Sequence, residues 1–171
     1  SGVMVIAKTN AAHRDLTKQF AEKKVKKEYI ALVHGHVEPR EGSIEAPLTR
    51  NQKNRTKIQV STGQKSRYAL THYRVKKIFT LPFPASLLSV RIETGRTHQI
   101  RVHLEAIGHP VVGDQVYTRR SEHALDQALG LPHQFLHAQQ LELISPTTNK
   151  TVSYSAEIPE ELEKILKVFR S

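Results

Sequence analysis

The chain has 171 residues, of which 38% are hydrophobic, and its 26 Lys and Arg against 16 Asp and Glu give a net charge of +10. This length and composition predict one globular domain with a substantial core, and no apolar run is long enough for a membrane-spanning helix. The absence of cysteine excludes disulfides and thiolate metal sites, and the excess of positive charge favours a polyanionic partner such as RNA or DNA.

The first part of the chain predicts one helix among strands. Residues 3–8 read as a strand, and residues 11–23 as a helix in which Leu16 and Phe20 repeat at i and i+4 behind an Asn10 cap. Pro and Gly place turns at 38–42 and 81–84. The remaining apolar, alternating segments predict strands at 25–36, 43–47, 66–79 and 86–93.

A basic segment at residues 50–57 contains four cations and neither an acidic nor an apolar residue. This composition predicts an exposed loop or hairpin. One interpretation is a solvated run of charge, and the other is contact with an RNA backbone, whose counterions such cations release on binding. The candidate RNA-binding residues of the segment are Arg50, Lys53, Arg55 and Lys57.

The segment from residue 89 to residue 110 predicts a strand, a turn at Gly95 and a helix with Thr97 as its cap. The spacing of the apolar residues turns one face of this helix toward the core; they are Ile100, Leu104 and Ile107. Three cationic or titratable side chains fall near the helix start, namely Arg96, His98 and Arg101. Free N–H groups and the helix dipole favour negative charge there, so the segment predicts a site for a phosphate or a carboxylate.

The last third predicts a polar loop over 118–133 with a short helix at 122–129, strands at 135–144 and 151–156, and a final helix. That helix has Pro159 at its first position, and its apolar stripe consists of Leu162, Ile165, Leu166 and Phe169. The elements together predict a single α+β domain over residues 1–171, with a mainly antiparallel mixed sheet and helices packed on it.

Three segments carry a resemblance to a known family. They are residues 91–103 with 108–114, residues 27–35 around Tyr29, and residues 136–141 followed by Ser145 and Pro146. In order and spacing they resemble the motifs of RNA pseudouridine synthases of the ribosomal large-subunit type, over nearly the whole chain. The resemblance implies the catalytic-domain fold of that family and the isomerisation of uridine to pseudouridine in RNA, with ribosomal RNA expected first and transfer RNA next. It also implies a cytoplasmic protein that needs no metal or organic cofactor.

The resemblance assigns roles to individual residues. Arg101 would pair with the nucleophilic aspartate and hold it ionised, and Tyr29 would lie against the flipped uracil and could act as a base. Leu136 would form the opposite wall of the substrate pocket, with Arg96 and His98 bracing the site or binding RNA phosphate. The residue types alone allow other roles, because Tyr29 and Leu136 could simply pack in a sheet.

One departure from the family concerns the nucleophile. The family's aspartate stands in a segment of the form Arg-Leu-Asp-x-x-Thr-Ser-Gly, which places it a few residues before Ser1, and none of Asp15, Asp114 and Asp126 can take its place. We therefore expect an upstream segment to carry the aspartate, and we expect this chain by itself to be inactive. The alternative is a non-catalytic RNA-binding module with the same fold.

Ten histidines raise the question of a metal site. The two closest pairs are His34 with His36 and His133 with His137. Neither pair has Cys, Asp or Glu at ligand-like spacing, so the sequence predicts no metal centre.

Overall fold

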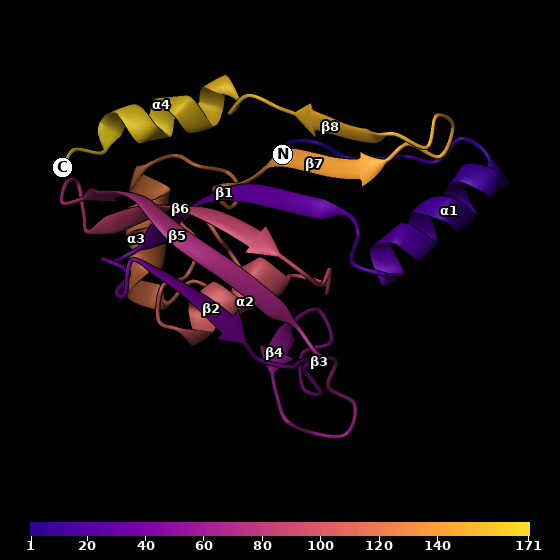
Figure 1. Ribbon diagram of the computed structural model, residues 1–171. Coiled ribbons are helices and arrows are strands. Elements are labelled where there is room, and N and C mark those ends of the chain that lie inside the picture. The colour runs from indigo at the N-terminus through magenta and orange to yellow at the C-terminus, as the bar shows by residue number, and fades with distance from the viewer.

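The computed structural model describes residues 1–171 and contains one six-stranded antiparallel sheet with the strand order β2-β5-β6-β1-β7-β8 (Figure 1). Its strands are β1 (Lys26–His34), β2 (Glu41–Glu45), β5 (Leu70–Phe79), β6 (Ala85–Ile92), β7 (Leu136–Ile144) and β8 (Thr151–Ser155). A separate two-stranded hairpin is formed by β3 (Leu48–Arg50) and β4 (Ile58–Val60). The predicted α+β class and antiparallel sheet are therefore confirmed, and the basic segment does form the tip of a hairpin.

Strand β1 lies inside the sheet, between β6 and β7, and both of its faces are covered. Ile30 and Leu32 belong to one apolar cluster, whereas the alternating residues Ala31 and Val33 belong to a second cluster on the other face. Because the four consecutive apolar residues from Ile30 to Val33 are all buried, this part of the strand reads as a continuous apolar run and not as an alternating one.

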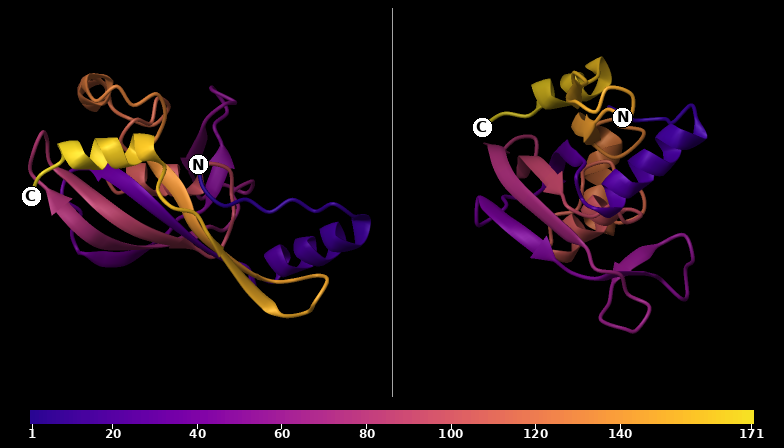
Figure 2. Two further views of the ribbon diagram at one scale, coloured as in Figure 1. Left: turned by 90° about the horizontal axis from the view of Figure 1, so that it is seen from above. Right: turned by 45° about the vertical axis from the view of Figure 1, so that its right-hand side comes forward.

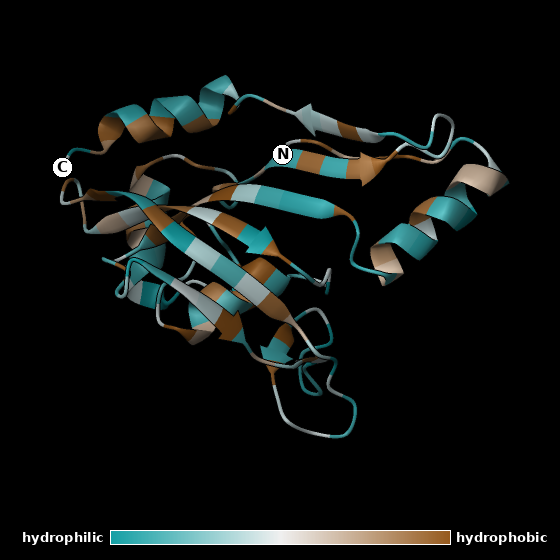
Figure 3. Ribbon diagram, viewed as in Figure 1, coloured by the Kyte–Doolittle hydropathy of each residue, from teal (hydrophilic) through white to brown (hydrophobic).

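The first face is covered by the C-terminal helix α4 (Glu160–Val168), whose apolar side is turned toward the strands in Figure 3. Leu162 and Ile165 pack with residues of β1, and the ring of Phe169 lies 5.4 Å from that of Phe79. The predicted stripe is confirmed at these positions, although Pro159 is the N-cap and not the first helical residue.

The second face is covered by α2 (Gln99–Ala106), which contributes Ile100 and Leu104 to the second cluster. Helix α3 (Arg120–Ala128) is attached to the end of β1 by the buried pair of His34 and Asp126, whose Nε2 and Oδ1 atoms are 2.8 Å apart. The prediction that Ile107 packs in the core is wrong, because this residue lies past the end of α2 and is 37% exposed.

Helix α1 (Asn10–Ala21) and the β7–β8 hairpin extend together from the rest of the molecule (Figure 2). Gln19 connects them, because its side-chain amide donates to the carbonyl of Ile144 at 2.7 Å and accepts from the amide of Ile144 at 2.9 Å. The N-cap of α1 is Thr9, whose hydroxyl accepts from Ala12 N, and not the predicted Asn10. Phe20 is 40% exposed, so only Leu16 of the predicted pair is buried.

The predicted first strand is wrong, since residues 3–8 form no strand. Pairing is limited to a bridge between Gly2 and Ala138, with 2.9 Å hydrogen bonds from Val3 N to Ala138 O and from Ala138 N to Ser1 O. On this edge of β7 the strand β8 already occupies the positions from Gln140 onward, so little edge is left for a further strand. No helix of the structure has the length and apolar character that crossing a bilayer requires.

Candidate active site and nucleic-acid interface

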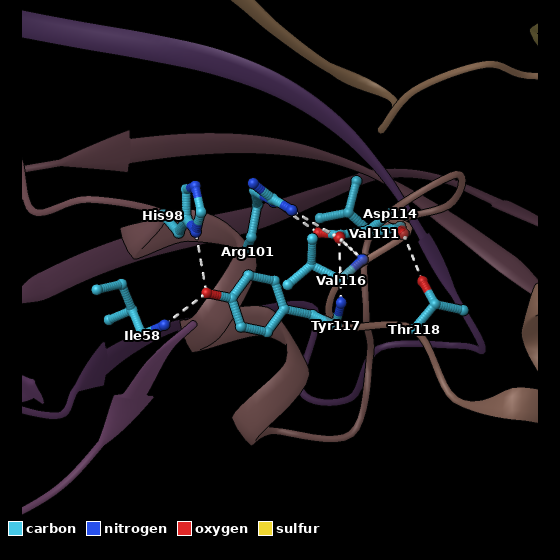
Figure 4. Close-up of polar contacts among 8 residues, drawn as sticks. All are labelled: Ile58, His98, Arg101, Val111, Asp114, Val116, Tyr117 and Thr118. Atoms are coloured by element: carbon cyan, nitrogen blue, oxygen red, sulfur yellow. Dashed lines mark hydrogen bonds and ion pairs between the residues drawn. The ribbon is translucent and has the colours of Figure 1, made fainter. Parts of the chain in front are cut away.

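A buried ion pair lies where α2 meets the loop that follows it (Figure 4). Arg101 contacts both carboxylate oxygens of Asp114, through Nε at 2.6 Å and Nη2 at 2.7 Å. Asp114 is 1% exposed and also accepts the backbone amides of Val116 and Tyr117 at 2.9 and 3.1 Å. Such a bidentate contact fixes the plane and direction of the guanidinium.

The protonation state of Asp114 follows from these contacts. Burial by itself would raise the pKa of this carboxyl group, but the hydrogen bonds from Arg101 and from two backbone amides outweigh burial and lower the pKa below its ordinary value. Asp114 is therefore a carboxylate at neutral pH. Arg101 uses Nε and Nη2 for this contact, which leaves Nη1 for another acceptor. The family resemblance implied that Arg101 pairs with an upstream aspartate, and it gave Asp114 no role in the site.

Tyr117 joins this ion pair to the basic hairpin. Its ring centroid lies 5.0 Å from the guanidinium carbon of Arg101, and its hydroxyl accepts the backbone amide of Ile58 in β4 at 2.9 Å. The hydroxyl is also 3.0 Å from Nδ1 of His98. Burial and the neighbouring Arg101 charge lower the pKa of His98, so its ring is neutral at neutral pH and Nδ1 can accept the Tyr117 hydroxyl hydrogen.

The start of α2 differs from the prediction. His98 is the N-cap residue, with a left-handed backbone (φ 55°) and no capping hydrogen bond from its side chain, so Thr97 is not the cap. The side chain of Gln99 organises the turn, because its Oε1 accepts from the Thr94 hydroxyl at 2.7 Å and from the Arg96 amide at 3.1 Å. Arg96 remains exposed, and its Nε donates to the carbonyl of Tyr68.

Tyr29 and Leu136 lie on the same side of the sheet as α2. Both pack at the margin of the apolar cluster that contains Ile100, and Tyr29 is paired with Val90 on one side and Ala138 on the other. Burial raises the pKa of the Tyr29 phenol above its ordinary value, so this group is protonated at neutral pH. Both residues are only partly buried.

The first residue of the chain lies beside Leu136. The amino group of Ser1 is 3.4 Å from the Leu136 carbonyl, and the Ser1 hydroxyl is 3.0 Å from Nδ1 of His137. Gly2 follows with a φ of 110°, and a Cβ there would overlap the backbone of Ala138. The residues around Ser1 are therefore held closely against the strand that carries Leu136.

A basic groove lies between the β3–β4 hairpin, the loop that follows it and the turn before α2. It has a volume of about 1050 Å³, and none of the 17 residues that line it is acidic. The cations that line it, which define the basic groove, are Arg50, Arg55, Lys65, Arg67 and Arg96. Lys53 and Lys57 do not line it, and the sequence reading missed Lys65 and Arg67 because they lie outside the conspicuous run of charge.

Several histidines have structural contacts, and the histidines do not form a cluster. His34 contacts Asp126, and the buried His103 lies 2.9 Å from both the Ala46 carbonyl and the Thr71 hydroxyl. No group of three or more His, Asp or Glu side chains is arranged to hold a metal ion.

The geometry described so far is an α+β domain with a buried arginine–carboxylate pair and a basic groove. Comparison with known proteins shows the family to which this domain belongs. Residues 1–106 match the family model described as RNA pseudouridylate synthase. The chain therefore belongs to the RNA pseudouridine synthase family, as its sequence motifs predicted.

Individual relatives agree with this assignment. The chain is similar to proteins named ribosomal large subunit pseudouridine synthase D, with 42% identity over 170 residues to that of Zymomonas mobilis and 42% over 173 residues to that of Nitrosomonas europaea. These matches cover 98% and 100% of this chain but 52% and 48% of the relatives, so the chain spans about half of their length.

A solved structure, human RNA pseudouridylate synthase domain containing 1, superimposes with a TM-score of 0.79 at 29% identity, over 95% of this chain and 66% of that one.

Proposed function

We propose that this chain is the larger, C-terminal part of a catalytic domain that converts specific uridines of RNA to pseudouridine, with ribosomal large-subunit RNA as the substrate. The observation that carries the proposal is the Arg101–Asp114 pair, which holds a cation on the same side of the sheet as Tyr29. Tyr117 connects this cation to Ile58, which lines the basic groove. Two relatives named for the ribosomal large subunit support the choice of RNA.

The reaction breaks the bond between ribose C1′ and uracil N1 and joins C1′ to C5, while C5 loses a proton and N1 gains one. The uridine must first leave its stack, at a cost of a few kcal/mol that is smallest in a loop. In the proposed site Tyr29 and Leu136 contact the extruded uracil. Burial raises the pKa of Tyr29, and in the proposed site its protonated ring holds the base.

The nucleophilic aspartate of the proposed mechanism comes from a segment that precedes Ser1 in the longer protein. The position of Ser1 supports this arrangement, since its amino group lies 3.4 Å from the carbonyl of Leu136, at the edge of the proposed substrate pocket. The Nη1 atom of Arg101 would then contact the incoming carboxylate while Nε and Nη2 stay on Asp114. Arg101 would bridge two carboxylates and keep the nucleophile ionised.

Tritium release from RNA labelled at uracil C5 tests the proposal, because the isomerisation expels that hydrogen. We expect release with a longer protein that includes the Arg-Leu-Asp segment, loss of release when that aspartate is changed to asparagine, and no release with the 171-residue chain alone. Turnover by the 171-residue chain would contradict the assignment of the nucleophile. RNA binding without release by the longer protein would favour the alternative, a non-catalytic RNA-binding module.

A further inference from the structure

Lys27 is a buried cation that lacks an acidic partner. Its side chain extends from the same face of β1 as Tyr29, two residues away, and the residue is 9% exposed. No carboxylate forms an ion pair with it, and its ammonium lies 5.5 Å from the ring centroid of Phe20. The neighbouring Lys26 is its opposite, with a side chain that is 70% exposed and pairs with Glu142 at 2.7 Å.

Burial disfavours the charged ammonium of Lys27 and lowers its pKa as long as no anion is present. Buried lysines are rare unless they are paired. The cost of placing Lys27 here would be offset by an anion that binds to it.

Gly95 lies next to the Lys27 ammonium. It is exposed, its φ is not positive, and a Cβ built on it would meet only Nζ of Lys27, at 4.0 Å. Neither backbone strain nor packing therefore requires glycine at this position. A remaining reason for glycine is that a ligand approaches the backbone closely.

These two residues connect the basic groove to Tyr29. Gly95 and Arg96 belong to the wall of the groove. Lys27 belongs to the same strand as Tyr29, and its ammonium lies beside Gly95. An RNA strand that lies in the groove and delivers a nucleotide to Tyr29 would pass over Gly95. Its phosphate would then come within reach of Lys27.

We propose that Lys27 and Gly95 form a binding position for one phosphodiester group of the RNA strand, adjacent to the nucleotide held at Tyr29. The inference rests on the proposed function and deepens it. Lys27 is a positioning residue in this arrangement: its ammonium binds a phosphate oxygen, and Gly95 provides the space in which the backbone of the RNA lies.

The first test compares Lys27→Gln with Lys26→Gln in the 171-residue chain. Binding of a fluorescein-labelled RNA stem-loop with uridines in its loop is measured over a series of salt concentrations. We expect Lys27→Gln to bind about tenfold more weakly and to reduce the slope of log Kd against log salt by about 0.7, the value for one phosphate of a single strand. Lys26→Gln should change both quantities much less, and Lys27→Arg should retain most of the affinity.

A second measurement locates the phosphate. One linkage at a time in the loop is replaced by an uncharged methylphosphonate, with a 2′-deoxyribose on its 5′ side to prevent cleavage. At one linkage, the replacement should weaken binding to the wild-type chain. At the same linkage it should leave the affinity of Lys27→Gln unchanged, because the substitution and the methylphosphonate remove the same contact. Equal losses in both proteins at every linkage would overturn the proposal.

Gly95→Val provides an independent test, since the open space around Gly95 should leave the fold intact. We expect an unchanged thermal unfolding curve and a loss of RNA affinity that is smaller for Gly95→Ala. If the wild-type chain fails to bind RNA in a salt-dependent way, the proposed function itself fails. If the wild type binds but Lys27→Gln matches Lys26→Gln and Gly95→Val matches the wild type, only the phosphate position is wrong.

Discussion

The Arg101–Asp114 pair and the basic groove are both rich in charge, but their surroundings differ. Arg101 has a side chain that is 10% exposed and makes two contacts of 2.6 and 2.7 Å, so its direction is set by the fold. Arg55 and Lys65 of the groove are exposed and form no ion pair. The difference matches the two tasks of the proposed function, since the proposed reaction needs a cation held in one geometry, whereas recognition of a polyanion needs cations that can adapt.

The largest effect should come from breaking the buried pair. We expect Asp114→Asn to lower the free energy of unfolding by about 3 kcal/mol, because it leaves the Arg101 cation buried and unpaired. Urea unfolding of the 171-residue chain measures this change. Glu41→Gln is the matched control, since the Glu41–Arg74 pair has side chains that are 70% and 74% exposed and should contribute little. Equal losses in the two variants would show that burial does not distinguish these pairs.

The groove should respond in affinity and not in stability. We expect the triple change of Arg50, Arg55 and Lys65 to Gln to weaken RNA binding roughly 10- to 100-fold and to lower the salt slope by about 2. Fluorescence anisotropy with a labelled RNA stem-loop gives both values. The double change of Lys53 and Lys57 to Gln removes cations that do not line the groove, so a loss as large as that of the triple variant would contradict the mapped surface.

Tyr117→Phe should disturb the connection between the two regions. The variant keeps the ring under Arg101 but leaves the Ile58 amide without its acceptor, and we expect it to cost about 1–2 kcal/mol of stability. Amide hydrogen exchange should show faster exchange at Ile58, while the amides of α2 keep their protection. Unchanged exchange at Ile58 would mean that the hairpin does not depend on the Tyr117 hydroxyl.

A smaller effect should follow from pH. Burial lowers the pKa of His103, so the folded protein keeps this ring neutral while the unfolded chain takes up a proton below about pH 6.5. The unfolded state then binds more protons, and stability must fall as the pH is lowered, by up to ~1.4 kcal/mol per pH unit for one such group. Urea unfolding at several pH values tests this. A stability that does not change between about pH 7 and about pH 5.5 would argue against a neutral His103.

Much of the architecture could be predicted from local patterns. The apolar repeat of the last helix led correctly to Leu162 and Ile165, and the run from Val25 to His36 led to a central strand. The strand predicted at residues 3–8 does not form, because an alternating pattern shows only that a segment is able to pair. Pairing also needs a free strand edge, and β8 occupies that part of β7. Edge availability is a property of the assembled sheet and not of the segment.

The site was predictable only where a motif marked it. The family motif singled out Arg101, but the contact of Arg101 with Asp114 joins residues that are 13 positions apart through a loop. The periodicity of a single helix or strand does not predict such a contact. The groove shows the same limit. A cluster of charge in the sequence indicated Lys53 and Lys57, yet folding brings Lys65 and Arg67 to the groove in their place.

The side chain of Gln19 makes the same pair of backbone hydrogen bonds that a neighbouring strand would make. At Ile144 its amide both donates to and accepts from the backbone of β7, past the end of the pairing between β7 and β1. Unpaired backbone groups at a sheet edge invite other chains to add as further strands. Because Gln19 occupies both backbone groups of Ile144 from a helix, these groups are not available to pair with a strand of another chain.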